Sequence, residues 1–363
     1  MTRAGVAARS APEPSAGLAG GPEPTLADVA RAAGVSIATA SRAISGRGPV
    51  AQPTRDRVLS AARRLEFQPS AVGRSLRTRT SGLIGFVVPD IGSAFYASAL
   101  KGAQHRLALG GYQLALMDTD ERPEREAAAL RALAAQGVDG IIVCSTGLDG
   151  EAIADVRRRR GIPVVFFDNL GPGTGDGAVA LANEQGVGLL VEHLAAVHGH
   201  RRIAFVGGLE TETSGAERLA GFRLAVAARA LDLDPALVRA GDWTTAAGAR
   251  ETHALLDLAD RPDAIVYADA LMALGGLAVL RERGVAVPAD LAIVSFDDSD
   301  AGPLLDPPIT ALARRDRTIG DLAASLILRV LQGEAADPVE VRLPMELVVR
   351  RSCGCGSGPG SGS

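Results

Sequence analysis

After a leader rich in Pro, Gly, Ala and Ser (residues 1–24), apolar positions recur at helical spacing from residue 25 to 68. This pattern predicts three short helices. Thr25 and Asp28 have the spacing of a capping box at the start of the first helix, and Gly34 ends that helix. The leader shows no such periodicity, so we expect it to be disordered.

The second and third predicted helices each carry an apolar face. Ser36 can cap the second helix, and Pro53 suits the first turn of the third. The positions expected to face inward are Ala40, Ala43 and Ile44 in the second helix and Val58, Leu59, Ala62 and Leu65 in the third. Two short helices joined through a glycine turn are typical of a helix-turn-helix, whose second helix enters the major groove of DNA.

Beyond residue 80 the pattern changes to short apolar runs that alternate with stretches of helical periodicity. The runs typical of buried strands are Leu83–Val88, Leu114–Met117, Gly140–Val143, Pro163–Phe167, Ile203–Val206, Ala264–Tyr267 and Leu291–Phe296. The helical stretches include Arg125–Ala135, Gly186–Ala196, Glu217–Ala230 and Ala270–Gly284. This alternation favours an α/β core of doubly wound parallel sheets with helices on both faces. Roughly 270 residues are more than one such sheet needs, so we expect two subdomains.

The composition is that of a folded protein, with 47% apolar and 22% charged residues. It excludes a wholly disordered, collagen-like or coiled-coil chain, and no run of about 18 uncharged apolar residues could span a membrane. The net charge of −4 hides an asymmetry, because residues 1–80 hold twelve arginines and five acids and so carry +7. A basic head on an acidic body is typical of a protein with a polyanion partner, although cationic residues can equally decorate a solvated surface.

The cysteines are too few and too scattered for a disulfide framework; they are Cys144, Cys353 and Cys355. Together with the lack of an apolar N-terminal segment of the secretory type, they favour a reduced, cytoplasmic protein. His198-x-His200 and Cys353-x-Cys355 lack partner ligands at useful spacing, so we expect no metal and no cofactor. The Gly/Ser-rich stretch 353–363 is expected to be a flexible tail.

The second helix carries the main candidate DNA contacts. With Ala40 and Ile44 inward, Ile37 and Arg42 fall on the opposite face. Arg42 can reach a guanine edge or a phosphate, and nearby hydroxyls can bond phosphates. A helical hairpin packed on the body is the alternative, but it would leave an exposed Ile37 unexplained. The candidate DNA-binding residues of the head are Ser36, Ile37, Ala38, Thr39, Ser41, Arg42 and Thr54.

Residues 69–81 are predicted to form a short basic helix and linker between the head and the core. Ser70 follows a proline and can cap this helix, and Val72 and Leu76 lie four apart on one face. An exposed leucine among arginines is costly unless an apolar surface receives it, and a kinked DNA base step in the minor groove can do so. Ser70 and Leu76 are therefore further DNA-binding candidates. An ordinary linker helix docked on the core is the alternative.

The chain from Thr25 to about Ser352 resembles the lactose-repressor (LacI/GalR) family of bacterial transcription regulators. The motifs TLADVARAAGVSIATASRAIS, PSAVGRSLRTRTSGLIGFVVPD, GHRRIAFVGG, ERLAGF, GDW and IVSFDD carry the resemblance in this order. It implies a DNA-binding head (25–68), a hinge helix and a core like a periplasmic sugar-binding protein, in which the chain crosses three times between subdomains. The implied subdomains comprise residues 82–180 with 312–342, and 181–311 with 343–352.

The resemblance also implies a set of effector-binding residues. Arg218 in ERLAGF matches the family arginine that bonds ligand hydroxyls or carboxylates, and Asp297 in SFDD matches the acid that accepts from sugar hydroxyls. The remaining implied residues are Phe95, Tyr96, Asp168, Trp243 and Asp269. Carboxylates, a guanidinium and aromatic faces together suit a small polyol. The family has Asn-Asp where this chain has Asp269-Ala270, so one polar ligand contact is absent or displaced.

These observations predict a homodimeric repressor of carbohydrate-related genes whose two heads bind a near-palindromic double-stranded DNA operator. A small sugar-like effector would switch the operator affinity. The alternative is a transport-type sugar-binding protein, which has the same core but needs a signal peptide and no basic head. A Rossmann-type enzyme is a weaker alternative, because the GxGxxA stretch 173–178 precedes a strand-like run instead of a helix. No Walker, GxSxG or HExxH motif occurs, so we expect no enzyme.

Overall fold

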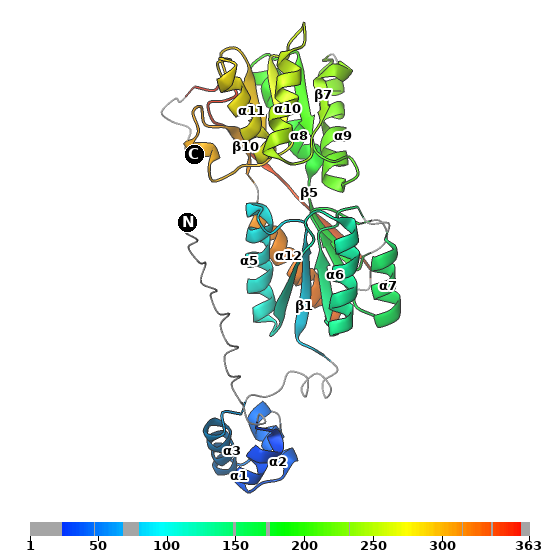
Figure 1. The fold of residues 1–363 in the computed structure, drawn as a ribbon, viewed down its shortest axis with the longest axis vertical. Helices are drawn as coiled ribbons and strands as arrows, with labels where there is room; N and C mark the ends of the chain where they lie inside the picture. The colour runs from blue at the N-terminus through cyan, green and yellow to red at the C-terminus, as the bar shows by residue number, and fades with distance from the viewer. Residues whose placement is uncertain are drawn as a thin grey trace, which may run out of the picture. The chain divides into compact units, whose positions relative to one another are not determined.

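The computed structural model describes residues 24–46, 48–67, 80–147, 150–171, 175–231, 233–313, 315–334 and 337–356. The chain divides into two compact units, a head up to Arg79 and a core from Thr80 (Figure 1). The predicted hinge positions Ser70 and Leu76 lie outside the described residues. Within the described ranges, no helix combines the length and the apolar character that a membrane crossing requires.

In the described part of the head lie the helices α1 (Leu26–Ala33), α2 (Ile37–Ser45) and α3 (Gln52–Arg64). Both predicted caps are confirmed. Thr25 and Asp28 form a capping box on α1, and the Ser36 side chain accepts a hydrogen bond from the Thr39 N–H at the start of α2. Gly34 ends α1 with φ +66°, a conformation that glycine adopts without steric cost. The described part of the head is thus a helix-turn-helix followed by a third helix.

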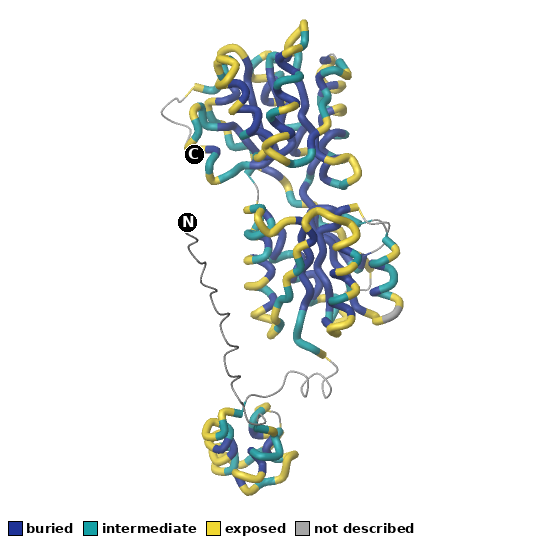
Figure 2. Tube along the Cα trace, viewed as in Figure 1, coloured by how far each residue is buried: buried dark blue, intermediate teal, exposed yellow. Residues whose placement is uncertain are grey.

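The head has its own small core, drawn dark blue in Figure 2. The buried side chains are Val29, Ala30, Ala33, Ala40, Ala43, Val58 and Ala61. The expectation that Leu59 faces inward is wrong, since its side chain is 37% exposed. The inward stripe of α3 runs through Val58, Ala61, Ala62 and Leu65, which have spacings of three and four, and Leu59 lies one position off this stripe.

The first sheet of the core, sheet A, has six parallel strands in the order β11-β5-β4-β3-β1-β2. The strands are β1 (Leu83–Val88), β2 (Gln113–Asp118), β3 (Gly140–Val143), β4 (Val164–Phe167), β5 (Gly177–Leu181) and β11 (Val339–Leu343). Its helices are α5 (Ala94–Leu109), α6 (Pro123–Gln136), α7 (Glu151–Arg160) and α12 (Asp316–Leu331). Helices α5 and α12 pack together on one face, and α6 and α7 cover the other (Figure 1).

The second sheet, sheet B, repeats this arrangement in the order β12-β10-β9-β8-β6-β7. Its strands are β6 (Ile203–Gly207), β7 (Val238–Ala240), β8 (Ala264–Tyr267), β9 (Ala292–Ser295), β10 (Thr310–Ala313) and β12 (Glu346–Val348). Its helices are α8 (Asn183–Glu192), α9 (Thr213–Ala228), α10 (Thr245–Leu256) and α11 (Ala270–Glu282). The prediction of two doubly wound sheets is confirmed, but sheet B is not wholly parallel, because β12 runs antiparallel to β10.

The chain passes between the two sheets three times. It leaves sheet A after β5, returns after β10, and leaves again after β11. The second passage lies after Ala313, because Leu312 and Ala313 still pair with β12 of sheet B. The described end of the chain departs from the expected flexible tail, since Cys353 is buried and Ser352 bonds to Ile293 and Thr310.

Helices α5 and α12 approach closely because a glycine on each faces the backbone of the other. A Cβ added at Gly320 of α12 would lie 1.8 Å from the carbonyl oxygen of Ala99, and one at Gly102 of α5 would lie 2.0 Å from that of Arg317. No side chain can occupy these positions without moving a helix. The two glycines therefore set the spacing of the helix pair that covers one face of sheet A.

Candidate functional site

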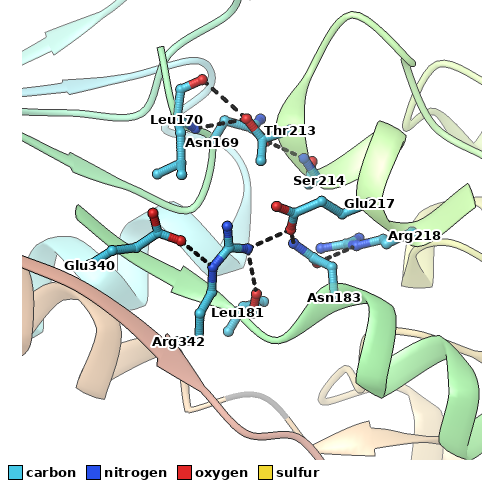
Figure 3. A network of polar contacts seen from close by, with 10 residues as sticks. All are labelled: Asn169, Leu170, Leu181, Asn183, Thr213, Ser214, Glu217, Arg218, Glu340 and Arg342. Carbon is cyan, nitrogen blue, oxygen red and sulfur yellow. Dashed lines mark hydrogen bonds and ion pairs between the residues drawn. The ribbon is translucent and has the colours of Figure 1, made fainter. Parts of the chain in front are cut away.

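The predicted effector-binding residues lie at the carboxyl ends of parallel strands, where ligands bind in open α/β sheets. On sheet A they follow β1 and β4, and on sheet B they follow β7, β8 and β9 or lie on α9. Hydrogen bonds join the two carboxyl edges. The Ser214 N–H donates to Asn169 Oδ1 at 2.9 Å, and the Leu170 N–H donates to Thr213 Oγ1 at 3.2 Å (Figure 3). The candidate residues therefore gather in two groups on edges that face each other.

Arg218, on α9, is the centre of the sheet B group and is only 3% exposed. Its Nε donates to Asn183 Oδ1 at 3.0 Å, and its Nη1 donates to the carbonyl oxygen of Ala268 at 2.7 Å. The same Nη1 lies 3.8 Å from Asp297 Oδ2. Several fixed acceptors hold the buried guanidinium, so its orientation is set before any ligand arrives.

Two aromatic rings enclose the same guanidinium. Its central carbon lies 3.8 Å from the ring centroid of Phe296 and 5.3 Å from that of Trp243. The Trp243 backbone has a left-handed φ of +65°. Its ring occupies the space beside Gly208, where an added Cβ would come within 2.0 Å of ring atoms. Phe296 was not predicted as a site residue, although it directly precedes Asp297 in the quoted motif.

Asp269 and Asp297 lie beside Arg218 and are both buried. Asp269 is the N-cap of α11, because its Oδ1 accepts the Met272 N–H at 2.8 Å. Burial, and secondarily the neighbouring Asp297 carboxylate, raise the pKa of Asp269 to about 7. Asp269 therefore has a capping role of its own, besides the ligand contact that the resemblance implies.

This raised pKa predicts that Asp269 lowers stability as the pH rises. The native carboxyl keeps its proton up to about pH 7, whereas the unfolded one loses it near its ordinary value of 3.8. Stability from this group is therefore fully present below about pH 4 and is lost as the pH rises from about 4 to 7, by up to about 1.4 kcal/mol per pH unit. The Asp269→Asn variant keeps a capping oxygen and cannot titrate. Urea unfolding of both proteins across this window should show a stability difference that varies with pH, and parallel curves would contradict the argument.

The sheet A group consists of Phe95, Tyr96 and Asp168. The Phe95 and Tyr96 ring centroids are 5.0 Å apart in an edge contact, and Tyr96 makes a second edge contact with Phe167. Burial raises the pKa of the Tyr96 hydroxyl well above its ordinary value, so this hydroxyl is neutral at pH 7. Asp168 is 5% exposed and has a left-handed φ of +60°. This edge offers aromatic faces, one hydroxyl and one carboxyl.

Glu212 connects the two groups and was not predicted from the sequence. Its Oε2 accepts from Trp243 Nε1 at 2.9 Å and from Asn169 Nδ2 at 3.1 Å. Burial raises the pKa of Glu212 to about 7, although these two hydrogen bonds lower it. Its position in the loop after β6, at the carboxyl edge of sheet B, is the signal that could have identified it.

A chain of hydrogen bonds, which we call the relay, leads from Arg218 to the crossing strands (Figure 3). Asn183, whose Oδ1 accepts from Arg218, donates through Nδ2 to Glu217 Oε2 at 2.8 Å. The same Glu217 oxygen accepts from Arg342 Nη1 of β11 at 2.6 Å, and this Nη1 also lies 3.4 Å from the Leu181 carbonyl oxygen at the end of β5. The site arginine is thus linked to two of the three passages between the sheets.

A cavity of about 300 Å³ lies beside β6 and β7. None of the predicted effector-binding residues lines it. Its polar lining includes Arg223, on the same helix as Arg218, and Glu210 and Arg239. The cavity and the Arg218 group therefore use different side chains of α9, and substitutions can distinguish them.

The head presents part of α2 to solvent. Ile37 is 55% exposed, and Ala38 and Arg42 are also exposed. The Arg42 Nε donates to the Ala38 carbonyl oxygen at 3.3 Å, which lays the side chain along the helix. The Ser36 and Thr39 hydroxyl oxygens lie 2.9 Å apart and close the start of α2. Of the other predicted head contacts, the half-buried ones are Ser41 and Thr54.

Two family models match the chain. The model for bacterial regulatory proteins of the lacI family matches residues 25–70, and a periplasmic binding protein-like domain matches residues 191–353. Catabolite control protein A of Priestia megaterium is 31% identical over 90% of this chain and 98% of its own length.

The core and head also match solved structures. The lac repressor dimer bound to operator and the anti-inducer ONPF aligns with a TM-score of 0.83 at 29% identity, covering 92% of this chain and 99% of that one. The complex of the transcriptional regulator CelR with cellobiose aligns with a TM-score of 0.70 at 31% identity, covering 91% of this chain and 99% of that one. The similarity therefore includes both the helix-turn-helix and the two-sheet core.

Proposed function

Because the chain belongs to the LacI family of bacterial regulatory proteins, we propose that it is a DNA-binding repressor whose operator affinity is switched by a small effector. The head reads operator DNA, and the core binds the effector between the facing carboxyl edges of its two sheets. One observation carries this proposal. A helix-turn-helix with an exposed second helix is joined, in one chain, to a buried guanidinium, carboxylate and aromatic cluster around Arg218.

On DNA, α2 is the recognition helix in the major groove. The exposed Ile37 and Ala38 offer apolar contacts to base edges, and Arg42 offers a guanidinium to guanine or phosphate. We assign hydrogen bonds to DNA phosphates to four hydroxyl side chains, those of Ser36, Thr39, Ser41 and Thr54. The hinge residues Ser70 and Leu76 stay in the proposal as minor-groove contacts that only the sequence supports.

The Arg42→Ala variant tests the assignment of the recognition helix. Binding fragments are first selected from a random-sequence DNA pool, and affinities are then measured by fluorescence anisotropy at fixed salt. Arg42→Ala should weaken operator binding by about 1–3 kcal/mol, roughly 5- to 150-fold, and much less on random DNA.

Arg31→Ala is the matched control, because it removes the same charge from the exposed end of α1. It should weaken operator and random DNA alike. If Arg42→Ala and Arg31→Ala have equal effects on both DNAs, α2 is not the recognition helix.

The effector we propose is a sugar or a sugar derivative. Arg218 and Asp297 would bond its hydroxyls, and Trp243 would cover the apolar face of the ring. Asp269 is also assigned to this site, as are Phe95, Tyr96 and Asp168 on the opposite edge. The similarity to a cellobiose-bound regulator supports this ligand class. Because Ala270 supplies no polar group where the family usually has an acid, the proposed ligand class includes an unusual glycoside or a nucleoside.

Switching follows from an effector that binds one arrangement of the two sheets better than another. A ligand held by both carboxyl edges favours their approach, and the relay connects Arg218 to the chain passages on which such a movement turns. The hinge then holds the two heads on DNA in only one of the arrangements. We propose this population shift as the mechanism.

The protein acts as a homodimer, with one head on each half of a near-palindromic operator. We place it in the cytoplasm, where its DNA target lies, and assign it no catalytic role because its relatives are transcription regulators. A transport-type sugar-binding protein would share the core but would have no use for a helix-turn-helix. Selection of near-palindromic DNA whose affinity a sugar then changes, in either direction, would establish the proposed function, and failure to select any sequence would refute it.

A further inference from the structure

Four potential metal ligands meet where the end of α8 contacts the C-terminal segment. They are His193, His198, Cys353 and Cys355, and their ligand atoms all lie within 4.8 Å of one another. His193 and Cys353 are buried, and His198 and Cys355 are half-buried. Neither the proposed DNA contacts nor the proposed effector site uses any of them. The expectation that Cys353-x-Cys355 lacks partner ligands was wrong, because the partners come from about 160 positions earlier in the chain.

The distances between these atoms fit one tetrahedral ion. Cys353 Sγ lies 3.2 Å from His193 Nε2, and Cys355 Sγ lies 3.2 Å from His198 Nε2 and 3.7 Å from His193 Nε2. A tetrahedral Zn²⁺ with Zn–S of about 2.3 Å and Zn–N of about 2.0–2.1 Å separates sulfur and nitrogen ligands by about 3.5 Å. These three sulfur–nitrogen separations therefore differ from those of a zinc site by only a few tenths of an ångström, and all four ligand atoms lie within 4.8 Å of one another.

The local backbone conformation lets the two histidines approach each other, and it does the same for the two cysteines. Residues five apart on an α-helix point about 140° away from each other. The turn His193–Val197 is a π-helix, and this wider turn brings His193 and His198 together with ring centroids 5.0 Å apart. Gly354 has a left-handed φ of +104°, so the chain can reverse between the two cysteines. The π-helical turn and the left-handed glycine therefore bring the two histidines and the two cysteines to the same place.

Neighbouring groups hold the ligands in place. The Thr310 hydroxyl lies 3.1 Å from Cys353 Sγ and can donate a hydrogen bond to it. Side chains around a metal site commonly hold the metal ligands in this way. The adjacent Ser352 bonds through its side chain to Ile293 and Thr310 of sheet B, so the backbone carrying Cys353 is anchored. His200 is not part of the group, since its Nδ1 lies 3.5 Å from Asp263 Oδ1.

We propose that His193, His198, Cys353 and Cys355 form a structural Zn²⁺ site that fastens the C-terminal segment to the end of α8. Two thiolates and two imidazoles favour zinc over the hard cations that oxygen ligands select. Four protein ligands leave no open position for substrate, so the ion has no catalytic role. The His-x₄-His spacing is usual for zinc, whereas Cys-x-Cys is tighter than usual and depends on Gly354.

Metal content of the full-length protein tests the site directly. The protein is purified without a histidine tag, under reducing conditions, from zinc-replete medium, and is measured by plasma mass spectrometry. We expect about one zinc per chain. After exchange into Co²⁺, the protein should show strong visible d–d bands and near-ultraviolet sulfur-to-cobalt charge transfer. Less than about 0.1 zinc per chain together with no cobalt spectrum would overturn the proposal, as would a Cys353–Cys355 disulfide in the freshly purified reduced protein.

Substitutions at the two half-buried ligands keep the test independent of gross misfolding. Cys355→Ser and His198→Asn should each lower the zinc content at least tenfold, and a chelator should lower the melting temperature of the parent protein but not of these variants. His200→Asn is the matched control, since it changes the neighbouring histidine that faces Asp263. It should keep a full zinc content and the chelator response. Equal zinc loss in His200→Asn and His198→Asn would contradict the assigned ligand set.

Discussion

Replacing Arg218 by alanine should abolish the response to the effector and lower the free energy of unfolding by about 3–5 kcal/mol. The variant leaves Asn183, the Ala268 carbonyl and Asp297 without the guanidinium that they contact in a buried setting. A charged hydrogen bond to a ligand is worth about 1.5–3 kcal/mol, so the loss of one should lower effector affinity by about 10- to 150-fold. Calorimetric titration with the effector and urea unfolding measure the two effects.

Arg223→Ala is the matched control for this experiment. Arg223 is exposed on the same helix and lines the separate cavity beside β6 and β7. We expect its effector affinity and stability to match those of the parent protein. The opposite pattern, in which Arg223→Ala loses the effector and Arg218→Ala keeps it, would place the effector in that cavity and refute the assigned site.

Replacing Gly320 by alanine should destabilise the protein by about 3 kcal/mol. A single added methyl group would lie 1.8 Å from the Ala99 carbonyl oxygen, so α5 and α12 must separate or tilt. The clashing atom belongs to the backbone, so the clash cannot be relieved by a change of side-chain rotamer. Since α12 packs on β3, β4 and β5, the loss should reach the whole of sheet A.

The same substitution at Gly188 provides the control. Gly188 lies in α8, and a Cβ there would meet nothing within 4 Å. Gly188→Ala should therefore be neutral or stabilise the protein by up to about 1 kcal/mol, because alanine favours the helix. Urea denaturation followed by circular dichroism compares both variants with the parent. If Gly320→Ala unfolds at the parent's midpoint, the close helix approach is wrong.

Much of the fold could be predicted from sequence, because in many elements the apolar pattern and the capping residues agree with the tertiary packing. The strands β1, β3 and β8 coincide with apolar runs, and the caps of α1 and α2 follow from single hydroxyl residues. Leu59 was misassigned because an apolar residue at the margin of a helical stripe cannot be placed by hydrophobicity alone. The antiparallel strand β12 was not foreseen, since one exposed and two half-buried residues are too short a run to give a periodic signal.

The candidate site was partly foreseeable for a different reason. Acids such as Asp269 and Asp297 were assigned through the family resemblance alone, and in the structure they directly follow β8 and β9 at the carboxyl edge of sheet B. Glu212 was missed because its importance comes from partners on both sheets. The histidine and cysteine cluster was missed because its two halves are far apart in the chain and one half depends on a π-helical turn, which sequence spacing does not reveal.

The relay has a thermodynamic consequence for how the two ligands of this protein affect each other. Arg218 bonds to Asn183, which begins α8 directly after the first passage, and the relay ends on Arg342 at the third. A movement of the sheets that strengthens effector bonds to Arg218 would, through these hydrogen bonds, also act on the passages. Linkage then makes the coupling reciprocal: the factor by which effector changes operator affinity equals the factor by which operator changes effector affinity. On the proposed function, bound operator thus changes the effector concentration to which the protein responds, by the same factor.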